Sequence, residues 1–189
     1  MREIIKMTNI INNKLSLATL AGGCFWCIEG AFSQLQGIHS ATSGYMGGDS
    51  SSPSYEEVCT GKSGHAEVVQ LSFDPAIISY QEILEIFFTL HDPTQLNRQG
   101  NDIGSQYRSA IFYHGENQQN IARNIIEEIT VAKIFSQQIV TKVCPAETFY
   151  SGEDYHQDYF NNNPENQYCQ AVVSPKLAKF RQTFMSKLK

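Results

Sequence analysis

The sequence is organised around an apolar run that ends in two adjacent glycines and a cysteine. Residues 15–21 are β-prone and mostly apolar, and Gly22 and Gly23 follow them directly. Two glycines between a strand and a helix allow a tight reversal with positive φ values that other residues avoid. The pattern after Cys24 is helical, so Cys24 is predicted to lie at a helix N-terminus. Unpaired N–H groups and the helix dipole favour a thiolate over a thiol at such a position.

A second cysteine follows one helical turn later. Cys24 and Cys27 have C-x-x-C spacing, and Phe25 and Trp26 lie between them. The pair could form half of a zinc site, but the sequence has no second C-x-x-C and no H-x-x-x-H to complete it. Ordinary core packing of the cysteine and the aromatic rings is the other alternative. The combination favours redox or nucleophilic chemistry, and we expect no metal and no cofactor.

Composition limits what the chain can do. Its 189 residues are enough for one domain with a full core, so we expect a single catalytic domain over 1–189, with a loosely ordered lead-in at 1–13. A net charge of −5 argues against broad nucleic-acid binding, and the apolar runs are too short to span a membrane. Five cysteines, an odd number, and the lack of an unbroken apolar signal segment indicate a cytoplasmic location.

The spacing of apolar residues predicts strands that alternate with helices. A capping box at 79–82 begins the strongest predicted helix. This order predicts an α+β sandwich with a split βαβ core. The predicted strands are 15–21, 38–45, 64–73, 107–114, 138–143 and 170–173, and the predicted helices are 24–35, 80–90, 116–135 and 175–188.

One glutamate stands out in this pattern. Within the strand at 64–73, Glu67 shares a face with Val69, Leu71 and Phe73. Desolvation on an apolar face should raise the pKa of this carboxyl above its model value of about 4.3. A carboxylic acid that keeps its proton near neutral pH can act as a general acid. A surface glutamate at a strand end is the ordinary alternative.

Several separated motifs resemble the peptide methionine sulfoxide reductases of the A type. They occur in the family's order and cover roughly residues 15–170. The resemblance implies a ferredoxin-like α+β core, a two-layer sandwich with long loop and C-terminal extensions. It also implies thiol-dependent reduction of methionine S-sulfoxide, free or in proteins, and so repair of oxidised proteins. The motifs are Gly23-Cys24-Phe25-Trp26, Gly64-His65-Ala66-Glu67, Gly100-Asn101-Asp102, Gln106-Tyr107-Arg108-Ser109, Tyr155-His156-Gln157-Asp158-Tyr159 and Asn163-Pro164.

The resemblance assigns a role to each matched residue. Cys24 would attack the sulfoxide sulfur and become a sulfenic acid, and Glu67 would protonate the oxygen. The phenols of Tyr55 and Tyr107 would donate hydrogen bonds to that oxygen, and the carboxylate of Asp102 would orient the site. The rings of Phe25 and Trp26 would hold the substrate's methyl group. His156 and Tyr159 are expected near the site, where a mainly structural role is equally compatible.

A second thiol must then attack the sulfenic acid, and an external reductant opens the resulting disulfide. The candidates are Cys169, where the family often carries a recycling cysteine, and Cys27 in the C-x-x-C pair. The residues after Cys169 depart from the family's flexible, glycine-rich tail. We expect Cys59 and Cys144 to be inert. Thioredoxin is the expected reductant, and a monomer is the expected state.

Two other functions fit parts of the sequence. A thioredoxin-like dithiol oxidoreductase would use Cys24 and Cys27 alone, but Phe25 and Trp26 fill the space where a protein disulfide would dock. In that case Cys27→Ser would abolish activity. A non-enzymatic module that binds zinc or methionine peptides is the other alternative, and stoichiometric zinc in the purified protein would identify it.

Overall fold

Six strands form a sheet in the order β7-β6-β1-β3-β2-β8, and neighbouring strands are antiparallel except for β6 and β7. The structure is a computed structural model that describes residues 15–189, so the predicted lead-in at 1–13 lies outside the described residues. Two short strands, β4 (Arg98–Gln99) and β5 (Asp102–Ile103), pair separately. The strands of the sheet are β1 (Ser16–Gly22), β2 (Ile38–Met46), β3 (Ala66–Phe73), β6 (Ser109–Tyr113), β7 (Lys142–Pro145) and β8 (Tyr150–Ser151).

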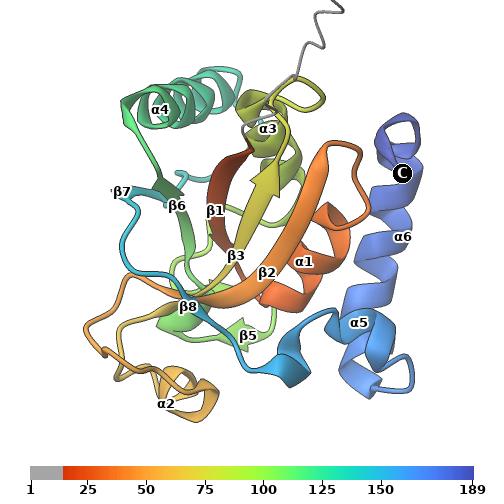
Figure 1. Cartoon of the computed structure of the whole chain (residues 1–189). Coiled ribbons are helices and arrows are strands. Elements are labelled where there is room, and N and C mark those ends of the chain that lie inside the picture. Colours follow the sequence, from red (N-terminus) through yellow and green to blue (C-terminus); the bar gives the residue numbers. More distant parts are fainter. Residues whose placement is uncertain (1–14) are drawn as a thin grey trace, which may run out of the picture.

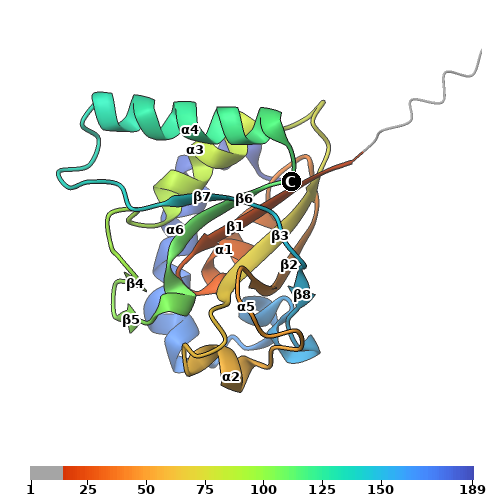
Figure 2. The same cartoon turned by 90° about the vertical axis from the view of Figure 1, so that its left-hand side faces the viewer.

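The helices gather mainly on one face of this sheet (Figures 1 and 2). That face and the helices share the larger apolar core, in which alternate residues of β1 and β3 such as Leu20 and Val69 are fully buried. The helices are α1 (Phe25–Phe32), α2 (Tyr55–Cys59), α3 (Tyr80–Leu90), α4 (Glu116–Val131), α5 (Tyr159–Asn162) and α6 (Ser174–Thr183). Four short helical turns are η1 (Ser105–Tyr107), η2 (Asp154–His156), η3 (Cys169–Val173) and η4 (Met185–Lys187).

A smaller core lies on the other face of the sheet. Met46, Val68 and Phe112 are buried there, and Phe149 packs against them. Phe149 belongs to the chain between β7 and β8, which crosses this face in Figure 1. Because of that crossing, the residues after β8 arrive at the end of the sheet where β1 stops.

The turn between β1 and α1 confirms the expected use of glycine. Gly23 has a φ of +87°, a value that favours glycine. A Cβ on Gly22 would lie 2.8 Å from the Phe87 ring, so no larger residue fits between β1 and α3. The chain can therefore reverse directly from the strand into α1, with Cys24 as the N-cap residue.

Three predicted elements differ from the structure. The expected strand at 170–173 is part of the π-helical turn η3, because Cys169 and Val173 are buried on one side of a segment that continues into α6. The expected strand at 138–143 is shifted to β7, since the Val140 N–H donates to the Pro93 carbonyl and not to the sheet. The helix predicted over 116–135 ends at Val131, and Lys133 has a φ of +52°.

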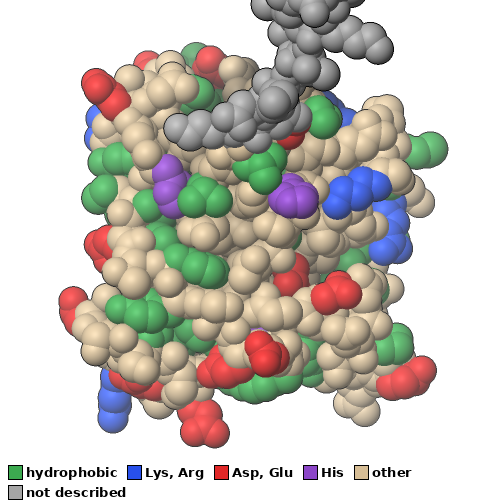
Figure 3. Space-filling model, in the orientation of Figure 1, with side chains coloured by type: hydrophobic (Ala, Val, Ile, Leu, Met, Phe, Trp, Pro, Cys, Tyr) green, Lys and Arg blue, Asp and Glu red, His purple; other side chains and the backbone are tan. Residues whose placement is uncertain are grey.

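On the side shown in Figure 3, Asp and Glu side chains lie along the lower part, at the end of the sheet where α2 lies in Figure 1. This face has no continuous basic patch among the described residues. Within 15–189, no helix has the length and apolar content needed to cross a bilayer.

The capping box of α3 gives a stability prediction. The Ser79 Oγ accepts the Glu82 N–H at 3.1 Å, and the Ser79 N–H donates to Glu82 Oε2 at 2.9 Å. Ser79→Ala should lower the free energy of unfolding by about 1 kcal/mol, because it leaves a helix N–H without its partner. Urea denaturation measures the change. Ser136→Ala, in an exposed bend, is the matched control, and an equal loss in both variants would contradict the prediction.

Candidate active site

A cavity of about 300 Å³ lies where β1 ends, β3 begins and several loops meet. It brings together every residue that the sequence predicts as catalytic, although these residues come from distant parts of the chain. Two lining residues, Asn166 and Tyr168, were not predicted. The cavity is lined by Cys24, Phe25, Trp26, Tyr55, Glu67, Asp102, Tyr107, Asn166 and Tyr168.

Cys24 is the N-cap residue of α1, and its carbonyl accepts the Cys27 N–H at 3.1 Å. Burial raises the pKa of the Cys24 thiol well above its ordinary value, and a hydrogen bond with Cys27 and the charge of Glu67 add to the rise. The expectation of a thiolate at rest is therefore wrong for this structure. The helix terminus contributes about 0.3–1 kcal/mol, whereas full burial can shift a pKa by about 3–5 units, at about 1.4 kcal/mol per unit.

Glu67 lies in β3 and is only 1% exposed. Its Oε2 accepts the Phe25 N–H at 3.1 Å, which is one of the N–H groups that the start of α1 leaves without a helical partner. Burial raises the pKa of Glu67 to about 8, although the hydrogen bond from Phe25 opposes the rise. The carboxyl therefore carries a proton at neutral pH, and its pKa is raised as the strand pattern predicts.

Two phenols face the same cavity. Tyr55 is the first residue of α2, and Tyr107 ends the turn η1. Burial raises the pKa of each phenol above its ordinary value, and the charge of Glu67 adds to both shifts. Both hydroxyls remain protonated across the physiological pH range, so each can donate a hydrogen bond to an oxygen in the cavity.

A third phenol, Tyr168, connects the nucleophile to a carboxylate. The Tyr168 Oη donates to Asp102 Oδ2 at 2.6 Å, and it also forms a hydrogen bond with the Cys24 side chain, which opposes only part of the rise in the pKa of that thiol. Asn166 holds this segment, because its Oδ1 accepts the N–H groups of Tyr168 and Cys169. The sequence signals neither residue beyond a general richness in aromatic side chains between 144 and 168.

The indole of Trp26 is fixed from behind by two residues that do not line the cavity. The Tyr159 ring stacks on it, with centroids 3.7 Å apart and planes within 4°. The Trp26 Nε1 donates to Nδ1 of His156, which is fully buried. His156 and Tyr159 thus lie next to the site, as expected, and contact it through Trp26.

Comparisons with known proteins agree with this geometry. A family model described as peptide methionine sulfoxide reductase matches residues 16–188. The chain belongs to the peptide methionine sulfoxide reductase family. It is 53% identical over 172 residues to the peptide methionine sulfoxide reductase MsrA of Polynucleobacter asymbioticus, which covers 91% of this chain and 90% of that relative. This chain is therefore an enzyme of thiol-dependent methionine sulfoxide reduction.

Solved structures of related reductases have the same architecture. Mxr1 from Saccharomyces cerevisiae in reduced form superposes with a TM-score of 0.76 at 38% identity, covering 82% of this chain and 89% of that one. Mxr1 in complex with Trx2 superposes with a TM-score of 0.55 at 27% identity, covering 82% and 91%. The central sheet and its helices are thus those of methionine sulfoxide reductases.

The remaining thiols of this reductase lie at different distances from the cavity. Cys27 is buried in α1 and forms a hydrogen bond with Cys24. Cys169 is buried in η3 and lines a separate cavity of about 280 Å³ beside Phe160 and Pro164. Burial raises the pKa of the Cys169 thiol, and the charge of Cys27 adds to the rise. Cys59 is exposed, and all five thiols are free.

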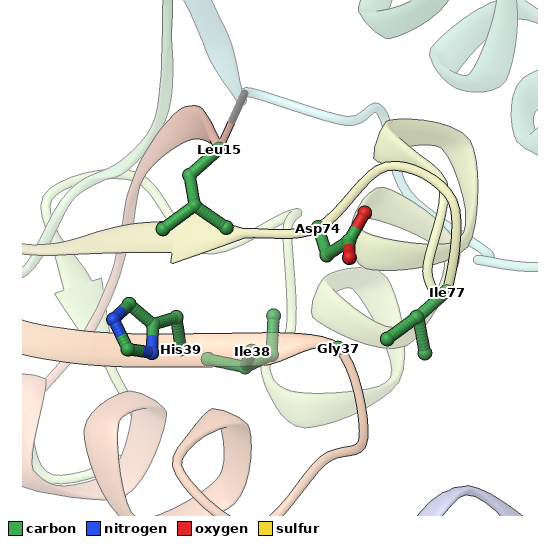
Figure 4. A pocket seen from close by; sticks show the side chains of 6 residues that line it. All are labelled: Leu15, Gly37, Ile38, His39, Asp74 and Ile77. Atoms are coloured by element: carbon green, nitrogen blue, oxygen red, sulfur yellow. The ribbon is translucent and has the colours of Figure 1, made fainter. Parts of the chain in front are cut away.

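A different cavity, of about 360 Å³, lies at the opposite end of the sheet (Figure 4). Its lining includes Leu15, Ile38 and Ile77, together with His39 and Asp74, and contains no thiol. Among residues 15–189, no group of three His, Cys, Asp or Glu side chains could hold a metal ion. The lining of this cavity therefore offers no thiol to a substrate.

The raised pKa of Glu67 predicts a pH dependence. Because the folded-state pKa of about 8 lies above the ordinary glutamate value of 4.5, Glu67 is protonated at neutral pH and loses its proton as pH rises through about 8. The rate of sulfoxide reduction in a single turnover should fall over that range, since the general acid is lost. Glu67→Gln should be slower by roughly 10²–10⁴-fold at pH 7 and should lack the step near pH 8.

The same proton affects stability, which provides a control that does not depend on activity. Its contribution to the free energy of unfolding is fully present below the unfolded-state pKa and is lost as pH rises through the folded-state pKa of about 8. The difference in the free energy of unfolding between the parent and Glu67→Gln should therefore vary with pH between about 4.5 and about 8. A parent rate that is flat from pH 6 to 9 would refute the assignment.

Proposed function

We propose that the protein reduces the S epimer of methionine sulfoxide, in proteins and as the free amino acid, by attack of the Cys24 sulfur on the sulfoxide sulfur. The observation that carries this proposal is the shared cavity of Cys24 and a protonated Glu67. A buried thiol and a buried acid that line one small cavity can act on the two ends of an S=O bond.

In the first step, the Cys24 sulfur bonds to the sulfoxide sulfur while Glu67 gives its proton to the oxygen. The positive end of the S–O dipole favours loss of the thiol proton as substrate binds. The oxygen then transfers to Cys24, methionine leaves, and a sulfenic acid remains. The thiol and sulfoxide together give the sulfenic acid and sulfide, so the step consumes no net proton once Glu67 recovers its own.

The phenols of Tyr55 and Tyr107 hold the sulfoxide oxygen by donating hydrogen bonds to it. Charge on this oxygen grows as the S–O bond breaks, so donors fixed in place stabilise the transition state more than the ground state. Asp102 acts through Tyr168, because its carboxylate accepts the phenol that also contacts Cys24. This pair orients the nucleophile.

Phe25 and Trp26 form the wall that receives the methyl group of the substrate. Support comes from their place in the cavity lining and from the way Trp26 is stacked on Tyr159. A rigid apolar wall excludes charged side chains, and it leaves the oxygen facing the phenols. His156 and Tyr159 take part in binding through their contacts with Trp26.

Cys27 is the first resolving thiol in this proposal, and Cys169 is the second. Cys27 lies one helical turn from Cys24, a separation that suits a disulfide, and the two side chains already form a hydrogen bond. Its thiol attacks the sulfenic acid, which gives the Cys24–Cys27 disulfide and releases water. Cys169 interacts with Cys27 and lines another cavity, so exchange onto Cys169 moves the disulfide away from the substrate.

A dithiol protein of the thioredoxin class then reduces the Cys27–Cys169 disulfide and returns both thiols. Support comes from the yeast relative solved in complex with Trx2. The five free thiols suit a reducing compartment, and we therefore place the protein in the cytoplasm.

The architecture supports a ferredoxin-like core that works as one catalytic domain and as a monomer. The order β6-β1-β3-β2 with antiparallel pairing, with α1 after β1 and α3 after β3, is the order of a split βαβ fold. All residues of the proposed site come from this core and its loops within one chain.

Stereochemistry tests the proposed function directly. Reduced protein mixed with one equivalent of the S epimer of a blocked methionine sulfoxide should convert it to methionine in a single turnover, and the R epimer should give essentially none. Chromatography of the product measures both. Cys24→Ser is the negative control. Equal turnover of both epimers, or none of the S epimer, would exclude the proposal.

The order of thiol exchange has its own test. After one turnover without reductant, mass mapping should find the Cys24–Cys27 disulfide in Cys169→Ser and the Cys27–Cys169 disulfide in the parent. Cys27→Ser should still release one methionine but should retain a sulfenic acid on Cys24. Cys144→Ser is the matched control. A Cys24–Cys169 disulfide formed at the parent rate in Cys27→Ser would disprove the relay.

A further inference from the structure

The helix that carries Tyr55 has little to hold it in place. α2 has five residues, of which only Val58 is buried, and a helix this short is not stable on its own. Tyr55 lies at its first position, where a helix N–H has no helical partner. The position of the Tyr55 phenol in the cavity must therefore be fixed by contacts from outside the helix.

Glu153, which lies 98 positions further along the chain, supplies one contact to the start of this helix and one to the sheet. Its Oε1 accepts the Tyr55 N–H at 2.8 Å, and its Oε2 accepts the phenol of Tyr45 at 2.7 Å. Tyr45 is fully buried in β2, so this carboxylate ties the start of α2 to the central sheet. Glu153 itself does not line the cavity.

The imidazole of His156 completes the support. Its ring lies 4.4 Å from the ring of Tyr55 and 4.9 Å from that of Phe25, and its Nε2 is 3.8 Å from Glu153 Oε2. Although burial alone would raise it, the pKa of Glu153 is lowered by the hydrogen bonds from Tyr45 and Tyr55, so the carboxylate is charged and accepts both. The contacts from residues 153–156 thus define where the Tyr55 ring lies.

We propose that Glu153 is a positioning residue that holds the Tyr55 phenol at the sulfoxide oxygen, an inference that rests on the proposed function. Glu153 touches no reacting atom. It acts through Tyr55 by fixing the backbone at the start of α2 against the sheet. The site therefore depends on a hydrogen bond between two segments that lie outside the β1–α1 turn and β3.

A double-mutant cycle tests this inference. In single turnovers with the S epimer, Glu153→Ala should slow reduction by about 10-fold, since small displacements of a catalytic group cost up to about 10²-fold. In the Tyr55→Phe background the same change should cost no more than about 2-fold, because the phenol that it positions is already gone. Glu153→Gln keeps an oxygen that accepts the Tyr55 N–H, so this variant should recover most of the parent rate. Adding Tyr55→Phe to Glu153→Gln should then lower the rate as it does in the parent.

Hydrogen exchange provides a readout that needs no activity. The amide of Tyr55 should exchange faster in Glu153→Ala than in the parent, whereas Glu56→Ala, at the exposed next position of α2, should change neither exchange nor rate. If Glu153→Ala does not fold, Glu153→Asp, which keeps the charge but is one methylene too short to reach both Tyr55 and Tyr45, replaces it in the cycle. An unchanged rate in the variant, or an equal loss in both Tyr55 backgrounds, would overturn the inference. If the parent left the S epimer unreduced, the proposed function would be refuted instead. Hydrogen exchange at the Tyr55 amide would then still decide whether Glu153 fixes the start of α2.

Discussion

The hydrogen bond from the Phe25 N–H to Glu67 is the contact on which the site depends. It joins the first residue of α1 to β3, and it places a carboxyl beside the thiol at the end of β1. Glu67 is almost wholly buried, and the cavity around it has no Lys or Arg in its lining. One N–H donor does not offset the cost of burying an ionised carboxylate without a cation, so the group keeps its proton.

The other residues of the site are attached to the core less directly than Cys24 and Glu67. Cys24 and Glu67 come from the turn and strand at the centre of the fold, where the backbone bonds are those of the sheet and α1. Tyr55 and Tyr168 come from peripheral segments that side-chain hydrogen bonds hold in place. Nucleophile and acid are therefore fixed by the backbone of the core, whereas Tyr55 and Tyr168 depend on side-chain contacts between distant segments.

The central part of this arrangement could be predicted from the sequence, and its periphery could not. The alternation around Glu67 reports its face correctly because a strand has a fixed period of two. The resting charge of Cys24 could not be read in the same way, because local position favours a thiolate and only the fold reveals the burial that opposes it. The segment 170–173 is rich in β-prone residues, yet it is helical because tertiary packing overrides propensity. Tyr168 and Glu153 act through partners distant in sequence, and no local pattern marks them.

The chemistry of this site requires a buried, neutral carboxyl that faces the reactive thiol, and titration of that carboxyl is the sharpest test of this requirement. Carbon-13 NMR of the Glu67 side-chain carboxyl, assigned by its absence in Glu67→Gln, follows the proton without any substrate. We expect a transition near pH 8, with the protonated form dominant at pH 7. A transition near the ordinary glutamate value of 4.5 would mean that the carboxyl is charged at neutral pH, and it would rule out Glu67 as a neutral general acid.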